Sequence, residues 1–391
     1  MEKKIYLDNA ATTFVSGEVL NEMMPCFNAI YGNSSSLHSF GRDAAAIVDR
    51  ARDRIMHAIG AKSPTEIYFT SGGTEADNWA IKGLAHAYAN KGKHIIVSQI
   101  EHHAILDSCA QLEKEGFEVS YAKCDKHGIV SIADIIHHIR PDTTLISVMA
   151  VNNEVGTIQN LLAIAKTAHE RGIIFHTDAV QAIGALRINV QDMEIDAMSM
   201  SAHKIHGPKG CGALYLKSGI RIENLMSGGN QERGKRGGTT NVPAIAGFGK
   251  AVEIAVRDMN INQKKIKSIR EYFLAKVEER IPYIHVNGHP YQKIQGTVNI
   301  SFEMIEGESI LMLLDLDGIA VSTASACTSN SLEPSHVLKA MGIPDEIAQG
   351  SIRFSFGKNN SKADIDYVVD KLATAVEKLR SISPITKAGR K

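Results

Sequence analysis

The strongest constraint on the fold of this chain is a regular alternation of apolar strand-like runs and helix-like segments between about Glu66 and Leu216. Each run ends in a polar or glycine-containing turn, and apolar residues at helical spacing follow it. The alternation predicts an α/β fold with a mainly parallel sheet that is covered by helices on both faces. Ligands bind such sheets at the carboxyl ends of the strands, so residues that follow strands are the candidates for function.

The length of 391 residues predicts two domains, because one hydrophobic core rarely serves so long a chain. We expect a large domain over residues 14–258. The remaining residues, 1–13 and 259–391, are expected to form a smaller α+β domain with strands near residues 298–302 and 352–356.

Composition excludes several function classes. The chain has 43 basic and 43 acidic residues, so its formal net charge is zero and no nucleic-acid footprint is indicated. It shows no apolar run of membrane-spanning length and no signal peptide at its start, so we expect no membrane partner and a cytoplasmic location. Its five cysteines include no Cys-x-x-Cys pair, which favours reduced thiols over a zinc site.

A lysine and an aspartate that follow successive strands form the candidate site. Lys204 stands in a turn-rich stretch after the apolar run that begins at Met198, and Asp178 ends the preceding apolar run. Lysine forms Schiff bases with carbonyls such as pyridoxal 5′-phosphate (PLP), and a carboxylate keeps the pyridine nitrogen of PLP protonated. Taken singly, a solvated lysine and a helix-capping aspartate are the simpler interpretations; together the two residues favour a PLP site.

Long motifs around this pair resemble the cofactor site of cysteine desulfurases of the NifS/IscS type, which are class V aminotransferase-like enzymes. The motifs are His176-Thr-Asp-Ala-Val-Gln181 and Ser201-Ala-His-Lys-Ile-His-Gly-Pro-Lys209, and the similarity extends from Tyr6 to Arg353. The resemblance implies PLP-dependent transferase fold type I, with a seven-stranded, mainly parallel sheet in the large domain. It also implies PLP as the cofactor, L-cysteine as the substrate, and L-alanine and a protein persulfide as products.

The resemblance assigns roles residue by residue. Lys204 carries the cofactor, Asp178 supports its ring nitrogen, and His102 stacks on the ring and acts as an acid or base. The implied cofactor contacts are Gly73, Thr74, His102, Asn153, Asp178, Gln181, Ser201, His203 and Lys204. Asn153 also contacts the substrate carboxylate. Thr239 lies in a glycine-rich loop that crosses the interface of a homodimer to the phosphate of the other subunit; a disordered basic loop is the alternative for this segment.

Cys327 is the candidate nucleophile, and Cys211, which is close to Lys204 in the sequence, is its best rival. Cys327 stands in a loop rich in Ser, Thr and Ala, and this loop resembles the family segment whose cysteine accepts sulfur. The chain departs from the family at Thr323-Ala324 and at Ala202, where glycines are usual, so we expect a stiffer loop. No intrinsic metal site is expected; the family suggests that Cys327 transiently shares a [2Fe-2S] ligand role with a scaffold protein.

Arg353 in a late apolar strand is interpreted either as a clamp on the substrate carboxylate or as half of an internal ion pair. The expected sulfur acceptor is an iron–sulfur scaffold protein, with nitrogenase maturation and tRNA thiolation also compatible. A short basic tail, residues 381–391, leaves docking by a longer extension in doubt. The rival functions are a selenocysteine lyase, another PLP-dependent lyase or aminotransferase, and a sulfur-carrier or scaffold-binding protein without catalysis.

Overall fold

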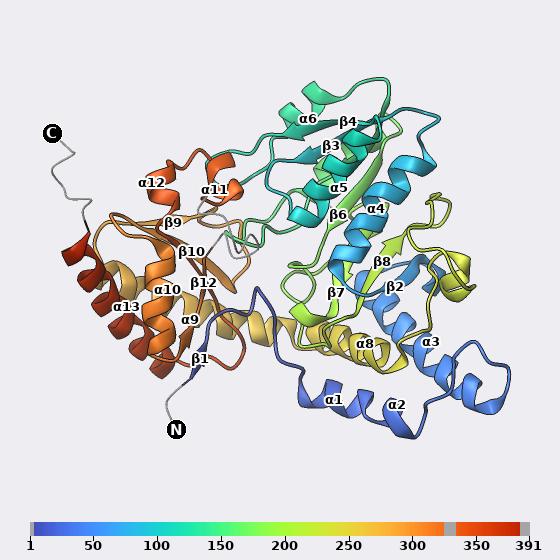
Figure 1. Cartoon of the computed structure of the whole chain (residues 1–391), viewed down its shortest axis with the longest axis horizontal. Coiled ribbons are helices and arrows are strands. Elements are labelled where there is room, and N and C mark those ends of the chain that lie inside the picture. The colour runs from blue at the N-terminus through green and yellow to red at the C-terminus, as the bar shows by residue number, and fades with distance from the viewer. Residues whose placement is uncertain (1–3, 324–333, 384–391) are drawn as a thin grey trace.

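The computed structural model describes residues 4–323 and 334–383, and a seven-stranded sheet dominates it (Figure 1). The strand order is β2-β8-β7-β6-β5-β3-β4; β8 runs antiparallel to both of its neighbours, and the other pairs are parallel. The predicted mainly parallel, seven-stranded sheet is therefore confirmed. Its strands are β2 (Ile67–Thr70), β3 (His94–Ser98), β4 (Glu118–Ala122), β5 (Thr143–Ser147), β6 (Ile174–Asp178), β7 (Ala197–Ser201) and β8 (Gly212–Leu216).

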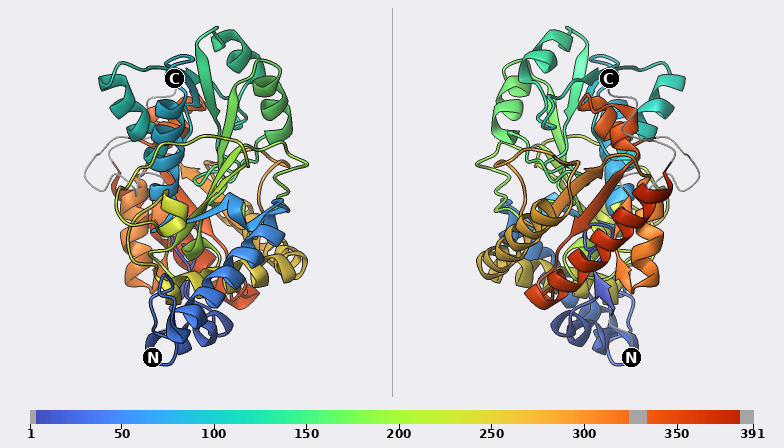
Figure 2. Two further views of the ribbon diagram at one scale, coloured as in Figure 1. Left: turned by 90° about the vertical axis from the view of Figure 1, so that its right-hand side faces the viewer. Right: turned by 90° about the vertical axis from the view of Figure 1, so that its left-hand side faces the viewer.

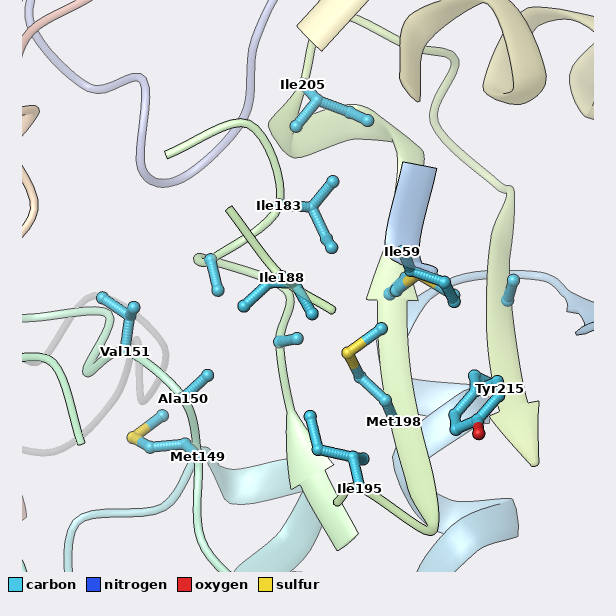
Figure 3. Packing of buried hydrophobic residues seen from close by; sticks show 14 of the residues in the cluster. Ile59, Met149, Ala150, Val151, Ile183, Ile188, Ile195, Met198, Ile205 and Tyr215 are labelled. Carbon is cyan, nitrogen blue, oxygen red and sulfur yellow. The ribbon is translucent and has the colours of Figure 1, made fainter. Parts of the chain in front are cut away.

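Helices cover both faces of this sheet. One face packs on α4 (Gly73–Ala87) and α5 (His103–Lys114) in a core that includes Trp79 and Leu112. The other face packs on helices of a larger core, part of which is shown in Figure 3. These helices are α1 (Gly17–Met23), α2 (Pro25–Asn28), α3 (Ser39–Ile59), α6 (Ile132–His138), α7 (Leu161–His169) and α8 (Val242–Arg257).

A second core lies around an antiparallel four-stranded sheet of order β12-β13-β10-β9. Ile5 and Leu7 from the N-terminal segment join this core, and β1 pairs with β11. Helices α9 and α13 lie next to each other, as the right-hand view of Figure 2 shows. The strands are β1 (Ile5–Tyr6), β9 (Ile284–Asn287), β10 (Thr297–Phe302), β11 (Ile319–Ala320), β12 (Ser322–Thr323) and β13 (Ser351–Ser355). The helices are α9 (Met259–Arg280), α10 (Gly307–Leu316), α11 (His336–Ala340), α12 (Asp345–Ala348) and α13 (Lys362–Ile382). The exact domain boundaries stay a prediction.

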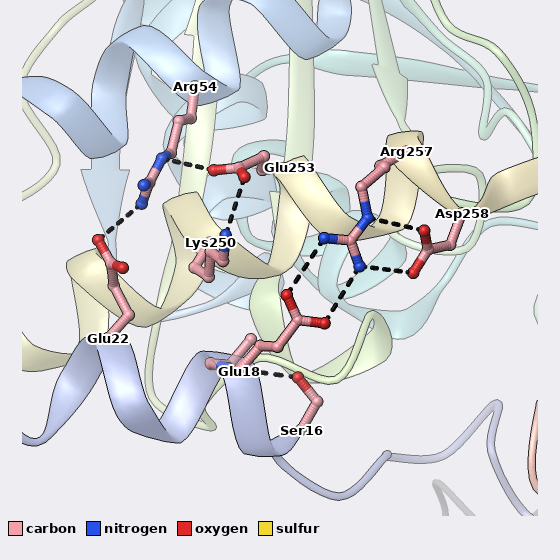
Figure 4. A network of polar contacts seen from close by, with 9 residues as sticks. Ser16, Glu18, Glu22, Arg54, Lys250, Glu253, Arg257 and Asp258 are labelled. Carbon is pink, nitrogen blue, oxygen red and sulfur yellow. Dashed lines mark hydrogen bonds and ion pairs between the residues drawn. The ribbon is translucent and has the colours of Figure 1, made fainter.

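Local sequence signals explain where α3 begins and ends. The His38 side chain caps its N-terminus by accepting a hydrogen bond from the backbone of Gly41, and Gly60 ends it with a φ of 68°. That left-handed conformation is readily available to glycine and strained for most other residues. A polar network then joins α1, α3 and α8 (Figure 4): Arg54 bridges Glu22 and Glu253 at 2.8 and 2.7 Å.

Within the described residues, no helix combines the length and the apolar character needed to cross a bilayer. The same residues contain no group of three or more His, Cys, Asp or Glu side chains arranged to hold a metal ion.

Candidate active site

Lys204 and Asp178 meet at one edge of the large sheet. Asp178 is the last residue of β6, and β6 pairs in parallel with β7. Lys204 follows β7 in a single 3₁₀ turn, Ala202–Lys204, as the turn-rich sequence predicted. Its Nζ donates hydrogen bonds to the backbone carbonyls of Ala10 and Ala11 at 2.6 and 2.7 Å. The N-terminal segment therefore closes over the lysine.

Two buried carboxyl groups lie beneath this edge, and their surroundings differ. Burial raises the pKa of both Asp77 and Asp178, and the charge of Asp178 raises the pKa of Asp77 further. Asp178 accepts a hydrogen bond from the backbone of Val180 at 2.8 Å and is favoured as an anion by His102 and Lys204. Asp77 has no such cation, so Asp77 is the group that keeps the proton and Asp178 is the anion.

The N-terminus of α4 forms an anion cradle beside them. Helix α4 starts at Gly73, and the preceding Gly72 has no side chain that could cap it. The first backbone amide groups of the helix are therefore available to bind an anion. The buried Ser201 Oγ has no hydrogen-bond partner in the part of the chain that the structure describes. A Cβ at Gly73 would come within 2.8 Å of Val180 and 3.5 Å of Ser201 Cβ, so the cradle has no room for a side chain. Thr74 is exposed.

The remaining predicted cofactor contacts lie at the ends of neighbouring elements. His102 is the N-cap of α5, and burial lowers its pKa, as does Lys204, while Asp178 opposes them. Gln181 donates to the carbonyl of Ala10 at 2.9 Å. His203 contacts the hydroxyl of Thr12 at 3.1 Å, and burial lowers its pKa to about 4.

Arg353 approaches the same region from β13 and has an internal partner. Its guanidinium pairs with Asp8 at 3.1 Å and donates to the carbonyl of Asn153 at 3.0 Å. Its Nε is buried without a hydrogen-bond partner among residues 4–323 and 334–383. The ion pair expected under the second interpretation is present, and the unpartnered Nε leaves Arg353 with capacity for a further acceptor.

The segment around Thr239 is folded against the rest of the chain rather than disordered. Glu232 pairs with Arg52 through two contacts of 2.8 Å, and Arg236 pairs with Glu75 in the first turn of α4 at 2.8 Å. Thr239 itself is exposed.

The structure describes four cysteines, and all four are buried or partly buried. Burial raises the pKa of Cys109 and Cys211 to about 12 and that of Cys124 to about 11, and it also raises the pKa of Cys26. A thiol must ionise to attack, so none of these four is suited to it. Cys327 lies outside the described residues, as does Ala324.

Two side chains of the site, Glu101 and Asp8, were not predicted from the sequence. Glu101 is fully buried, accepts hydrogen bonds from Ser98 and from the backbone of Met149, and has a pKa raised by burial to about 8. Its position shortly after β3 and directly before His102 was the signal available. Asp8 was missed because the N-terminal segment meets β13 only through tertiary structure.

The arrangement suits a ligand with a phosphate at one end and a protonated ring nitrogen at the other. The anion cradle with the unpartnered Ser201 hydroxyl fits the phosphate, and the buried Asp178 fits the nitrogen. The fold with this site is that of a fold-type I PLP enzyme.

Comparison with known proteins agrees with this class. Residues 5–368 match the aminotransferase class-V family. Cysteine desulfurase IscS from Dictyoglomus turgidum is 50% identical over 384 residues, which is 98% of this chain and 97% of that protein. The solved structure of a NifS-like protein superposes with a TM-score of 0.91 at 37% identity, covering 96% of this chain and all of that one. The structure titled SspA in complex with cysteine gives a TM-score of 0.82 at 36% identity, covering 92% and 100%. The chain belongs to the aminotransferase class-V family and, within it, to the IscS-type cysteine desulfurases.

Proposed function

We propose that this enzyme uses PLP to convert L-cysteine to L-alanine and leaves the sulfur as a persulfide on Cys327. The observation that carries the proposal is the meeting of Lys204, Asp178 and the α4 cradle at one sheet edge. The structure of SspA with cysteine supports the choice of substrate, because it is a relative with the same fold. When bound, PLP supplies a carbonyl for the substrate amine and an electron sink for the bonds at its α- and β-carbons.

Each side chain then has a defined task. Asp178 holds the proton on the ring nitrogen, and Ser201 with the first turn of α4 binds the phosphate. His203 remains neutral near pH 7 because burial lowers its pKa to about 4, so it serves as an uncharged contact. Lys204 moves the proton at the substrate α-carbon.

His102, Asn153 and Gln181 complete the proposed cofactor contacts. Because burial lowers the pKa of His102, its ring is neutral near pH 7 and can accept a proton from the substrate. Gln181 lies against the N-terminal segment that also holds Lys204, which places both residues at the same side of the site. Arg353 binds the substrate carboxylate through groups that its pair with Asp8 does not use.

Sulfur transfer balances without an external oxidant. The Cys327 thiolate attacks the substrate Sγ, an S–S bond forms, and the Cβ–Sγ bond breaks with its electron pair left on carbon. A proton added at Cβ completes alanine. The persulfide then passes to an acceptor for which an iron–sulfur scaffold protein is our first choice, with nitrogenase cofactor and thiolated tRNA pathways as alternatives. A transient [2Fe-2S] ligand role of Cys327 would belong to that step.

A homodimer is the proposed assembly. Large apolar side chains are exposed along the segment that contains α1, α2 and the start of α3, and a second copy would bury them. They are Phe14, Leu20, Met24, Phe27, Tyr31, Leu37 and Phe40. The exposed Thr239 would then reach the phosphate of the partner subunit, held in place by the Arg236–Glu75 pair.

The test supplies L-cysteine to the PLP-loaded protein and measures both alanine and protein-bound persulfide. Lys204→Ala should abolish alanine formation, and the control Lys264→Ala, on the exposed face of α9, should not change it. A protein that releases selenium from L-selenocysteine but forms no alanine from L-cysteine would support the selenocysteine lyase instead. Undiminished alanine formation in Lys204→Ala would refute the proposed chemistry.

A further inference from the structure

Helix α9 and the segment that leads into β10 each carry a buried cation, Arg270 and Lys293. Both are far along the chain from the groups assigned to PLP. Arg270 on α9 is 8% exposed and Lys293 is 7% exposed. The acid nearest to Arg270 is Glu271, whose carboxylate is 3.7 Å from Nη2 and 56% exposed. No carboxylate within residues 4–323 and 334–383 forms an ion pair with Lys293. These cations therefore lack a buried counter-charge.

This arrangement is unfavourable unless something compensates it. Burial lowers the pKa of both groups, and the charge of Arg270 lowers that of Lys293 further. The Nε of Arg270 and the Oε1 of Gln295 are buried and have no hydrogen-bond partner within the described chain. Buried polar groups are nearly always hydrogen-bonded, so the unpartnered Nε of Arg270 beside a second buried cation indicates a place for an acceptor.

Lys293 lines a cleft of about 550 Å³ that could hold such an acceptor. Further lining residues include Lys126 and His127, which follow β4, and His285 on β9. Leu274 and Glu278 of α9 also line it, and Arg270 is one turn from Leu274 on the same stripe of that helix. Among the described residues, Glu278 is the only acid that lines the cleft, whereas Lys126 and Lys293 both line it. Basic side chains therefore outnumber acidic ones.

We propose that this cleft binds an oxyanion, with Lys293 as its inner ligand and Lys126 at its mouth; the buried charge of Arg270 next to Lys293 adds to the attraction. The anion supplies the counter-charge that Lys293 lacks, and charge-assisted hydrogen bonds to it are short and strong. The cleft is larger than a single phosphate ion, so the oxyanion can belong to a phosphate ester or to a small organic acid. The proposal does not depend on the sulfur chemistry of the enzyme.

The experiment measures the thermal unfolding midpoint of the PLP-loaded protein in sodium phosphate, sodium malonate and sodium chloride at equal ionic strength. The loaded protein is used so that the α4 cradle is already filled. We expect the midpoint to rise and saturate with phosphate or malonate relative to chloride, because a ligand that binds only the folded state stabilises it. A rise with phosphate alone identifies a phosphate group, and a rise with malonate identifies a carboxylate.

Lys293→Met should lose most of this rise while unfolding in chloride at no lower temperature than the parent, because one of two like buried charges is gone. Lys267→Met, on the exposed side of α9, is the matched control and should keep the rise. If Lys293→Met does not fold, titration calorimetry of Lys126→Met with phosphate should give at least a severalfold weaker affinity. The proposal is overturned if neither anion raises the midpoint of the parent, or if Lys293→Met or a folded Lys126→Met binds phosphate as the parent does.

Discussion

Replacing Glu101 by glutamine should stabilise the cofactor-free protein at neutral and alkaline pH. The carboxyl is fully buried, and its pKa rises from the ordinary 4.5 to about 8 because burial disfavours the charged form. The folded protein therefore holds a proton that the unfolded chain has released. This contribution to stability is complete below about pH 4.5 and is lost progressively as the pH rises through 8.

The magnitude follows from the size of that change. Each pKa unit corresponds to about 1.4 kcal/mol, so ionisation of Glu101 costs the folded state at most about 5 kcal/mol above pH 8. Glutamine keeps an Oε1 that can accept from Ser98 and from Met149, so it retains both hydrogen bonds and does not titrate. Glu101→Gln should therefore gain stability over the parent as the pH rises from 5 to 9.

The assay is urea unfolding at five pH values from 5 to 9, followed by fluorescence. Trp79 is the only tryptophan of the chain, is fully buried on α4, and reports on the core next to the site. Glu113→Gln, on the exposed side of α5, is the control and should follow the parent at every pH. A constant difference between Glu101→Gln and the parent from pH 5 to pH 9 would refute the assignment of Glu101 as a protonated acid.

Three further substitutions test the site. Gly73→Ala should weaken PLP binding and destabilise the protein by about 1–3 kcal/mol, because its Cβ would lie 2.8 Å from Val180; absorbance titration with PLP and urea unfolding measure this. Arg236→Ala leaves the carboxylate of Glu75 unpaired at the start of α4, and should cost up to about 3 kcal/mol and raise the dimer dissociation constant in analytical ultracentrifugation. Asp178→Asn should lower alanine formation by about 10²–10³-fold while PLP still binds, as measured by steady-state kinetics.

Matched variants decide whether these effects are specific. Gly17→Ala alters the first residue of α1, where a Cβ meets nothing within 4 Å, so it should change neither stability nor PLP binding. Arg221→Ala removes an arginine that is exposed and outside the Glu75 pair, and it should leave the dimer intact. Asp192→Asn, in an exposed turn, should keep full activity. If a control variant loses as much stability, binding or activity as its test variant, the structural explanation for that test variant is wrong.

The strands that position the site could be predicted from the sequence because buried parallel strands form continuous apolar runs. Lys204 and Asp178 were placed correctly at the ends of β7 and β6 from the turn residues that follow these runs. Motif similarity supplied Ser201, whose unpartnered hydroxyl the structure then revealed next to the cradle.

Contacts between distant segments could not be predicted in this way. The hydrogen bonds from Lys204 to Ala10 and Ala11 join residues 194 and 193 positions apart, and the pair between Arg353 and Asp8 joins residues 345 positions apart. Such contacts depend on how the N-terminal segment crosses between the two cores, and no local pattern of hydrophobicity encodes that path.

The central claim is that Cys327 receives the sulfur, and a single-turnover reaction tests it most directly. The PLP-loaded parent, Cys327→Ala and Cys211→Ala are each mixed with one equivalent of L-cysteine, and persulfide is located by alkylation and mass spectrometry. We predict alanine and a persulfide on Cys327 in the parent and in Cys211→Ala, and neither product in Cys327→Ala. Alanine and persulfide formed as fast by Cys327→Ala as by the parent would contradict the account.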